Sequence, residues 1–145
     1  MWFDHENIFD QAANITVTRK STKALDLNRA AQDIGEGEEI TIRIAVVTAF
    51  TAVGAATLKI ALVTDDNAAL TSPVVLQDQS VVIPVADLII GFERVFTILP
   101  SSVMEQWLGL VYTVATGPMT AGAIDAAVVE SVQGWEAYPR NYVTT

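Results

Sequence analysis

Two stretches of the chain decide the fold: EITIRIAVVTAF at residues 39–50 and TLKIALVTDDN at residues 57–67. Branched aliphatic residues occupy alternate positions in both of them: Ile40, Ile42, Ile44, Val46, Leu58, Ile60 and Leu62. A period of two is typical of β-strands that bury one side and expose the other. Because the connection between the stretches is short and contains Gly54, the sequence predicts that the two strands pair antiparallel.

Further strand patterns lie on both sides of this pair. We predict them at residues 14–20, 21–27, 74–77, 92–99, 106–115 and 122–133. Residues 80–91 contain Pro84 and leave two alternatives open, a single helical turn or an edge segment. Residues 1–13 are predicted to form an extended N-terminal arm, and residues 134–145 an aromatic C-terminal tail.

About eight short strands with no convincing long helix predict an all-β fold. Residues 1–145 are expected to form a single-domain β-sandwich, since this length is typical of one domain. The number of strands favours the jelly-roll type over a seven-stranded immunoglobulin arrangement.

The composition excludes several classes of protein. The formal net charge is -9, the pI is near 4.3, and there is no Cys to form a disulfide or a thiolate metal site. Domains that bind nucleic acid normally have a basic surface, so we expect no nucleic-acid partner. No unbroken apolar stretch is long enough for a transmembrane helix, and the acidic first residues do not resemble a secretory signal. We therefore expect no membrane association.

Residues that could catalyse a reaction are sparse. His5 is the only His and lies between two acids in the predicted arm, whereas nucleophilic triads need a His held beside a nucleophile. The run Asp65-Asp66-Asn67 could offer oxygen ligands to calcium, but its spacing is more typical of a capped turn. The sequence thus predicts no catalytic residue, no cofactor and no metal site, and the protein is not expected to be an enzyme.

Basic and aromatic residues are unevenly distributed. Half of the basic residues fall within residues 19–29, and aromatic residues gather near both termini. The basic cluster has two interpretations, solvated strand edges that discourage aggregation or a docking site for an acidic protein surface. Aromatic residues are enriched in interface cores, although they also pack a terminus onto its own domain. The predicted interface comprises Trp2, Phe3, Ile8, Phe9, Arg19, Lys20, Lys23, Arg29, Trp135, Tyr138 and Tyr142.

Several strand and turn motifs follow one another in a recognisable order over most of the chain. They are Phe3-Asp4, Ile8-Phe9-Asp10, Leu25-Asp26-Leu27, Asp33-Ile34-Gly35-Glu36-Gly37-Glu38, Thr64-Asp65-Asp66-Asn67-Ala68-Ala69, Ser72-Pro73, Leu99-Pro100, Leu108-Gly109-Leu110-Val111-Tyr112 and Thr120-Ala121-Gly122. In their order and spacing, the chain resembles the Bbp16-type capsid cement (decoration) proteins of tailed bacteriophages. None of these motifs is catalytic.

This resemblance implies a jelly-roll protein on the outer surface of the phage head, part of the virion and made in the cytoplasm of the bacterial host. Its partner would be the major capsid protein, whose subunits it would clamp together, and we expect it to act as a homo-oligomer, a dimer or a trimer. Two alternatives stay open. One is a carbohydrate-binding β-sandwich module, and the other is a different virion component such as a tail-tube or head-completion protein.

Overall fold

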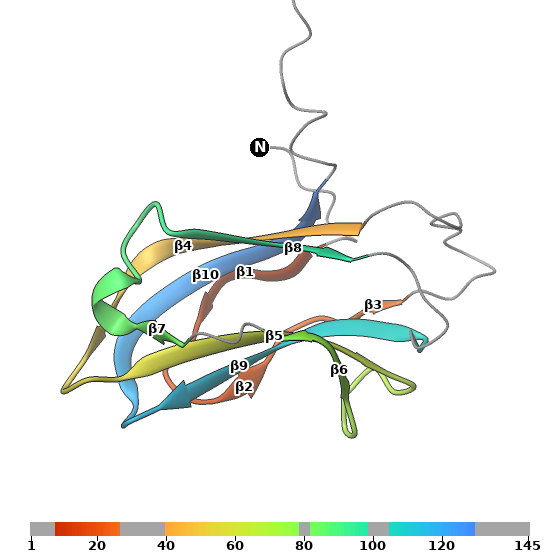
Figure 1. Cartoon of the computed structure of the whole chain (residues 1–145), viewed down its shortest axis with the longest axis horizontal. Helices are drawn as coiled ribbons and strands as arrows, with labels where there is room; N and C mark the ends of the chain where they lie inside the picture. Colours follow the sequence, from red (N-terminus) through yellow and green to blue (C-terminus); the bar gives the residue numbers. More distant parts are fainter. Residues whose placement is uncertain (1–7, 27–39, 79–81, 99–104, 130–145) are drawn as a thin grey trace, which may run out of the picture.

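The computed structural model describes residues 8–26, 40–78, 82–98 and 105–129 (Figure 1). Strands dominate these residues, together with one short 3-10 turn. The elements are β1 (Ile8–Asn14), β2 (Arg19–Lys20), β3 (Leu25–Asp26), β4 (Ile40–Ala52), β5 (Thr57–Asp65), β6 (Val74–Asp78), β7 (Ile83–Pro84), η2 (Val85–Asp87), β8 (Glu93–Ile98), β9 (Trp107–Ala115) and β10 (Met119–Val129). Among the described residues, no helix has the length and apolar character needed to cross a membrane.

The strands form two antiparallel sheets that pack face to face (Figure 1). The first sheet has the order β1-β10-β4-β8. The second has the order β2-β9-β5-β6, with β3 also paired to β9 and β7 to β5. The pairs β1 with β10, β2 with β9, β4 with β8, and β5 with β6 join strands that are progressively closer in the chain. A long hairpin rolled into two sheets has this pattern, so the predicted sandwich of jelly-roll type is confirmed.

The core lies between the two sheets and is built from the alternating aliphatic residues. Six of them, three from each of the two long stretches, are at most 3% exposed and belong to one cluster: Ile40, Ile42, Ile44, Leu58, Ile60 and Leu62. Burying one such side chain contributes about 1.5–3 kcal/mol relative to leaving it in water. The predicted division of each strand into a buried and an outward side is confirmed.

β4 and β5 do not pair with each other, so that prediction is wrong. β4 lies between β10 and β8 in the first sheet, and β5 lies between β9 and β6 in the second. The connection through residues 53–56 therefore crosses from one sheet to the other over the end of the core. A hairpin and a crossing both bury one side of each strand, so the alternation of apolar residues does not identify the partner.

The predicted arm is shorter than expected, because residues 8–13 belong to β1. This strand pairs with β10, and its residues Phe9 and Asp10 are each 1% exposed. The register shifts on both sides of Asp10, which breaks the period of two and hides the strand in the sequence. Residues 1–7 and the predicted tail 134–145 lie outside the described residues.

The remaining strand predictions are confirmed in part. β6, β8 and β9 each begin and end within one residue of the predicted limits, whereas β10 begins three residues earlier, at Met119. The strands predicted at residues 14–20 and 21–27 are reduced to β2 and β3, because residues 15–18 cross between the sheets. Both alternatives for residues 80–91 are present, as the short strand β7 and the turn η2.

The strand register brings four connections to one end of the sandwich, on the left in Figure 1. Ala52 at the end of β4 pairs with Met119, and Thr57 at the start of β5 pairs with Ala115. The Met119 amide donates to the carbonyl oxygen of Thr16 over 2.9 Å, which brings the β1–β2 connection to the same place. We call this end the apolar end and define it as residues 15–18, 53–56, 85–92 and 116–118.

The opposite end carries the loop of residues 66–73 and the strand ends that lead out of the described residues. Asp65, Asp26 and Trp107 meet there, because Trp107 pairs with both acids. In the first sheet, Ile40 pairs with Ile98, so the start of β4 and the end of β8 lie at this end as well.

Candidate functional site

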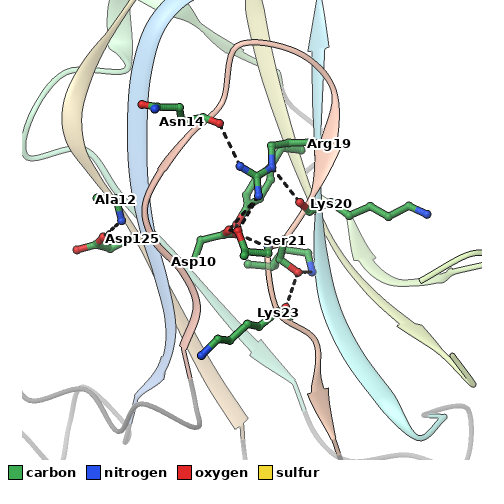
Figure 2. Close-up of polar contacts among 11 residues, drawn as sticks. Asp10, Ala12, Asn14, Arg19, Lys20, Ser21, Lys23 and Asp125 are labelled. Atoms are coloured by element: carbon green, nitrogen blue, oxygen red, sulfur yellow. Dashed lines mark hydrogen bonds and ion pairs between the residues drawn. The ribbon is translucent and has the colours of Figure 1, made fainter. Parts of the chain in front are cut away.

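A buried polar network joins the two sheets close to β1. Asp10 accepts hydrogen bonds through both carboxylate oxygens: the Tyr112 hydroxyl donates to Oδ2 over 2.7 Å, and the Thr22 amide donates to Oδ1 over 2.9 Å. The Thr22 hydroxyl donates to Oδ1 as well, over 2.6 Å. Arg19 lies 3.4 Å from the same oxygen (Figure 2). Since β1 and β9 belong to different sheets, this network ties the sandwich together through its interior.

The guanidinium group of Arg19 is held by several acceptors of its own chain. It donates to the main-chain oxygens of Asn14 and Lys20 over 3.1 and 3.0 Å and to the Thr22 hydroxyl over 2.7 Å (Figure 2). A guanidinium group has five donors in a rigid plane, so these contacts use most of them. Arg19 was predicted as an interface residue, yet its head group bonds within the molecule.

The network keeps Tyr112 protonated. Burial raises the pKa of the Tyr112 hydroxyl well above its ordinary value of 10.0, and the Asp10 carboxylate beside it raises the pKa further. A phenol of this kind donates a hydrogen bond at every physiological pH, and it is poorly matched to proton transfer near neutrality. The cluster therefore has the chemistry of a structural bridge.

A second polar cluster shapes the loop of residues 66–73. Asp65 is 1% exposed and accepts hydrogen bonds from the amides of Asn67, over 3.2 Å, and Ser72, over 2.8 Å. The Asn67 side chain in turn accepts from the Ala69 amide over 2.8 Å. Such bonds define Asx turns, so the turn-capping interpretation of residues 65–67 is confirmed.

Leu70 fastens this loop to the outer side of the second sheet. Its side chain is 2% exposed and lies over Gly109 of β9, where an added Cβ would come within 2.4 Å of Leu70 Cδ1. Lys20 Nζ donates to the carbonyl oxygen of Leu70. Gly109 therefore provides the space that Leu70 fills, and a second predicted interface residue, Lys20, has a partner inside the molecule.

The two carboxyl groups that begin the loop influence each other. The Ser72 amide lowers the pKa of Asp65, whereas the hydrogen bond and the charge of Asp65 raise the pKa of Asp66. In the part of the chain that the structure describes, no group of three or more His, Cys, Asp or Glu residues could hold a metal ion. Asp65 caps the loop through its hydrogen bonds from the Asn67 and Ser72 amides.

The apolar end presents a different surface. Its four connections contain a single charged residue, Asp87. Aliphatic side chains are exposed on three of the four connections: Val17 by 57%, Val53 by 88%, Ile89 by 59% and Ile90 by 69%. Three glycines with positive φ form the bends of this end: Gly54, Gly91 and Gly117.

The predicted interface residues are only partly brought together. Phe9 belongs to the core and is 1% exposed, so its side chain is not on the surface while β1 is folded. Ile8 is half-buried and Lys23 is exposed. The others lie outside the described residues: Trp2, Phe3, Arg29, Trp135, Tyr138 and Tyr142.

The sequence did not predict the apolar end, although it contains a signal. Turns between strands usually carry polar residues, because these bond to the free main-chain groups. The connections VGAA at residues 53–56, LIIG at 88–91 and TGP at 116–118 carry no charge. Each one alone reads as an ordinary tight turn, and only the strand register shows that they share one end.

Comparison with protein families gives one match. The Bbp16 family model matches residues 9–128, from β1 to β10. No curated protein matches the chain.

Proposed function

The chain belongs to the Bbp16 family, and from that membership we propose that it is a capsid cement protein of a tailed phage. In this role it binds the outer surface of the head and stabilises contacts between major capsid protein subunits. The observation that carries the proposal is the family match over residues 9–128, which spans the sandwich from its first described strand to its last. The motifs that resemble cement proteins lie largely within the same residues.

The physical basis of this role is repeated burial at an interface. Each copy contributes a modest contact with the shell, and icosahedral symmetry repeats that contact many times. A protein that binds the assembled shell but not its separated subunits stabilises the shell by mass action. We propose that the protein acts there as a homo-oligomer, a dimer or a trimer.

The described polar residues support a structural role over a catalytic one. Asp10 and Asp65 are buried carboxylates, and both are occupied by hydrogen bonds within the molecule. Catalytic carboxylates need a free oxygen directed at a substrate. We therefore propose that the protein is not an enzyme.

The test uses the phage whose genome encodes the chain. Heads are prepared with and without the gene, purified protein is added back to the deficient heads, and binding is measured by co-sedimentation. We expect the protein in wild-type virions, saturable binding to deficient heads, and release of packaged DNA at a higher temperature after binding. Absence from purified virions would overturn the proposal. A C-terminal label seen on tails by electron microscopy would instead indicate a tail component.

The part played by the residues before β1 can be tested separately. Removal of residues 1–7 leaves β1 intact, whereas removal of residues 1–13 would destroy a strand of the first sheet. If these residues contact the shell, the shorter truncation weakens binding to heads and leaves the circular dichroism of the sandwich unchanged. Unchanged occupancy on heads would rule out this role.

A further inference from the structure

The bends of the apolar end are held by main-chain hydrogen bonds, although their side chains are exposed. Gly54, Gly91 and Gly117 have φ values of 110, 101 and 95°, and a Cβ added at any of them would meet nothing within 4 Å. These glycines are therefore required by the backbone conformation and not by close packing. Behind them, Val85 donates its amide to the carbonyl oxygen of Ala56, and Phe50 donates its amide to that of Leu88. The bends are thus fixed to the strands.

The distribution of charge singles out this end. The chain carries a net charge of -9, yet its four connections here include only Asp87. In contrast, Val53, Ile89 and Ile90 are each more than half exposed. Charges that border these connections in sequence include Glu93 and Arg94, and the Arg94 guanidinium lies over the Phe92 ring at the border of this end. Exposed aliphatic residues gathered at short turns are typical of a surface that a partner covers.

The chain's own segments outside the described residues all begin away from this end, apart from residues 79–81. Ile8 and Val129, which lead to the two termini, lie at the opposite end, because Ile8 pairs with Ala127 and Val129 with Thr41. β10 alone separates the two ends by about 35 Å, at 3.3 Å per residue. The described strand ends that lead to both termini are therefore remote from the apolar end, and we consider a partner protein as its occupant.

The size of the exposed aliphatic surface favours the assembled capsid over a second copy of this chain as the partner. Four aliphatic side chains with these exposures present on the order of 500 Å² of accessible surface in total. A stable dimer in solution buries about 800 Å² on each partner. A smaller contact is sufficient where symmetry repeats it over an assembled particle.

We propose that the apolar end is the surface by which this protein docks on the capsid, against an uncharged, aliphatic surface of the assembled major capsid protein. This inference rests on the proposed function and adds to it the contact face and its chemistry. Val53 and Ile90 are the central contacts, because they are the most exposed aliphatic residues of this end. Binding then depends on burial of apolar area, and salt affects it little.

The experiment compares two matched substitutions of exposed valines by Glu. Val53→Glu introduces a charge at the apolar end, and Val75→Glu introduces the same charge on β6, where the valine is 54% exposed. Both proteins are added to heads that lack the chain, and binding is measured by co-sedimentation at 50 and 500 mM NaCl. We expect Val53→Glu to weaken binding at least tenfold, Val75→Glu to bind as wild type, and wild-type binding to change less than twofold with salt. Ile90→Glu provides a second variant with the same expected loss.

The binding results separate failure of the docking inference from failure of the proposed function. Thermal melting checks that the variants remain folded, and wild-type affinity for Val53→Glu and Ile90→Glu overturns the inference while leaving the proposed function intact. Failure of the wild-type protein to bind heads overturns both. Sedimentation velocity tests the remaining occupant: a wild-type dimer that Val53→Glu converts to a monomer, with capsid binding retained, would assign the apolar end to a second copy and overturn the inference.

Discussion

The apolar end and the opposite end of the sandwich use their side chains in different ways. At the opposite end Asp65 is buried and bonded, and on β1 and β2 the buried Asp10 and the basic residues Arg19 and Lys20 also bond within their own chain. At the apolar end, Val53 and Ile90 extend into solvent, and the turns are held by main-chain hydrogen bonds such as that from the Val85 amide to the Ala56 carbonyl oxygen. The buried charges serve internal cohesion, whereas the apolar end exposes aliphatic side chains.

Formal charge in the sequence therefore does not separate residues that bond within this molecule from residues that are exposed. The cluster of basic residues at 19–29 stands out in the sequence, and of its three described members Arg19 and Lys20 bond within the molecule while Lys23 is exposed. The most exposed aliphatic residues lie in connections that show no unusual composition one at a time. Substitutions at the anchors of the two ends test whether they are stabilised in different ways.

The largest effect is expected beneath the apolar end, at Gly122. This residue has a φ of 141°, and an added Cβ would lie 2.3 Å from ring atoms of Phe50, which is buried. Gly122→Ala is expected to cost about 4 kcal/mol of unfolding free energy, from overpacking together with backbone strain. Urea denaturation gives the value.

The matched control for this substitution is Gly117→Ala. Gly117 also has a positive φ, 95°, but an added Cβ meets nothing within 4 Å. It should therefore cost only the backbone strain, about 1–2 kcal/mol. Equal costs for the two substitutions would show that the Phe50 ring yields easily, and would contradict a rigid anchor under this end.

The next largest loss of stability is expected from Asp10→Ala, which removes the central acceptor of the buried polar network. Asp10→Ala leaves the Tyr112 hydroxyl and the Thr22 amide without their acceptor and the Arg19 guanidinium without its carboxylate. We expect a loss of about 3 kcal/mol in the free energy of unfolding, because buried donors lose their partners. Asp87→Ala at the apolar end is the control, with a change within about 0.5 kcal/mol. A loss below 1 kcal/mol for Asp10→Ala would mean that the network is not what holds the sheets together.

Sequence patterns predicted the class of the fold well because the core is made of strongly alternating strands. β4, β5 and β9 each carry aliphatic residues at every second position, and no other regular structure has that period. The pairing of the strands could not be predicted in the same way. A crossing between sheets through residues 53–56 and a hairpin give identical alternation, and the difference lies in long-range contacts with β8, β9 and β10.

The functional surfaces were less predictable for two physical reasons. β1 escaped detection because the register shifts around Asp10 remove its period, so Phe9 was read as an interface residue when it belongs to the core. The apolar end is made of four segments that are distant in the chain and become one surface only after folding. The capped turn at residues 65–67 was predicted correctly, since Asp and Asn bond to main-chain amides within a few residues.

A smaller effect is expected for Gly109→Ala, which disturbs the seat of the 66–73 loop. It should lower the free energy of unfolding by about 2 kcal/mol. Gly109→Ala would place a Cβ within 2.4 Å of Leu70 Cδ1, so the Leu70 side chain must move from its seat. In a protein that already carries Leu70→Ala, the same Gly109→Ala change should cost less than about 0.5 kcal/mol, because the clash is gone. A double-mutant cycle measured by denaturation tests this coupling. Additive costs would show that Leu70 does not rest on Gly109 in solution.

The smallest effect is expected in the pH dependence of stability. Its direction follows from the lowered pKa of Asp65. The Ser72 amide lowers the pKa of Asp65 from its ordinary 3.8, so the ionised carboxylate stabilises the folded state at every pH above that value. As the pH falls below 3.8 and through the folded pKa, this contribution disappears. Asp65→Asn should therefore lower the Tm by a few degrees at pH 7, with the difference from wild type shrinking toward pH 2.

Asp66, on the same loop, serves as the control because its pKa is shifted in the opposite direction. Its pKa is raised by Asp65, so its ionised form is disfavoured in the folded state, and Asp66→Asn should leave the Tm at pH 7 unchanged or slightly higher. Parallel Tm profiles for the two variants would contradict the assignment of Asp65 as the cap. If the profiles diverge as expected while binding to heads stays at the wild-type level for both, the acids of the opposite end act on folding alone. That result would agree with docking through the apolar end, because the two acids lie on the loop at the opposite end.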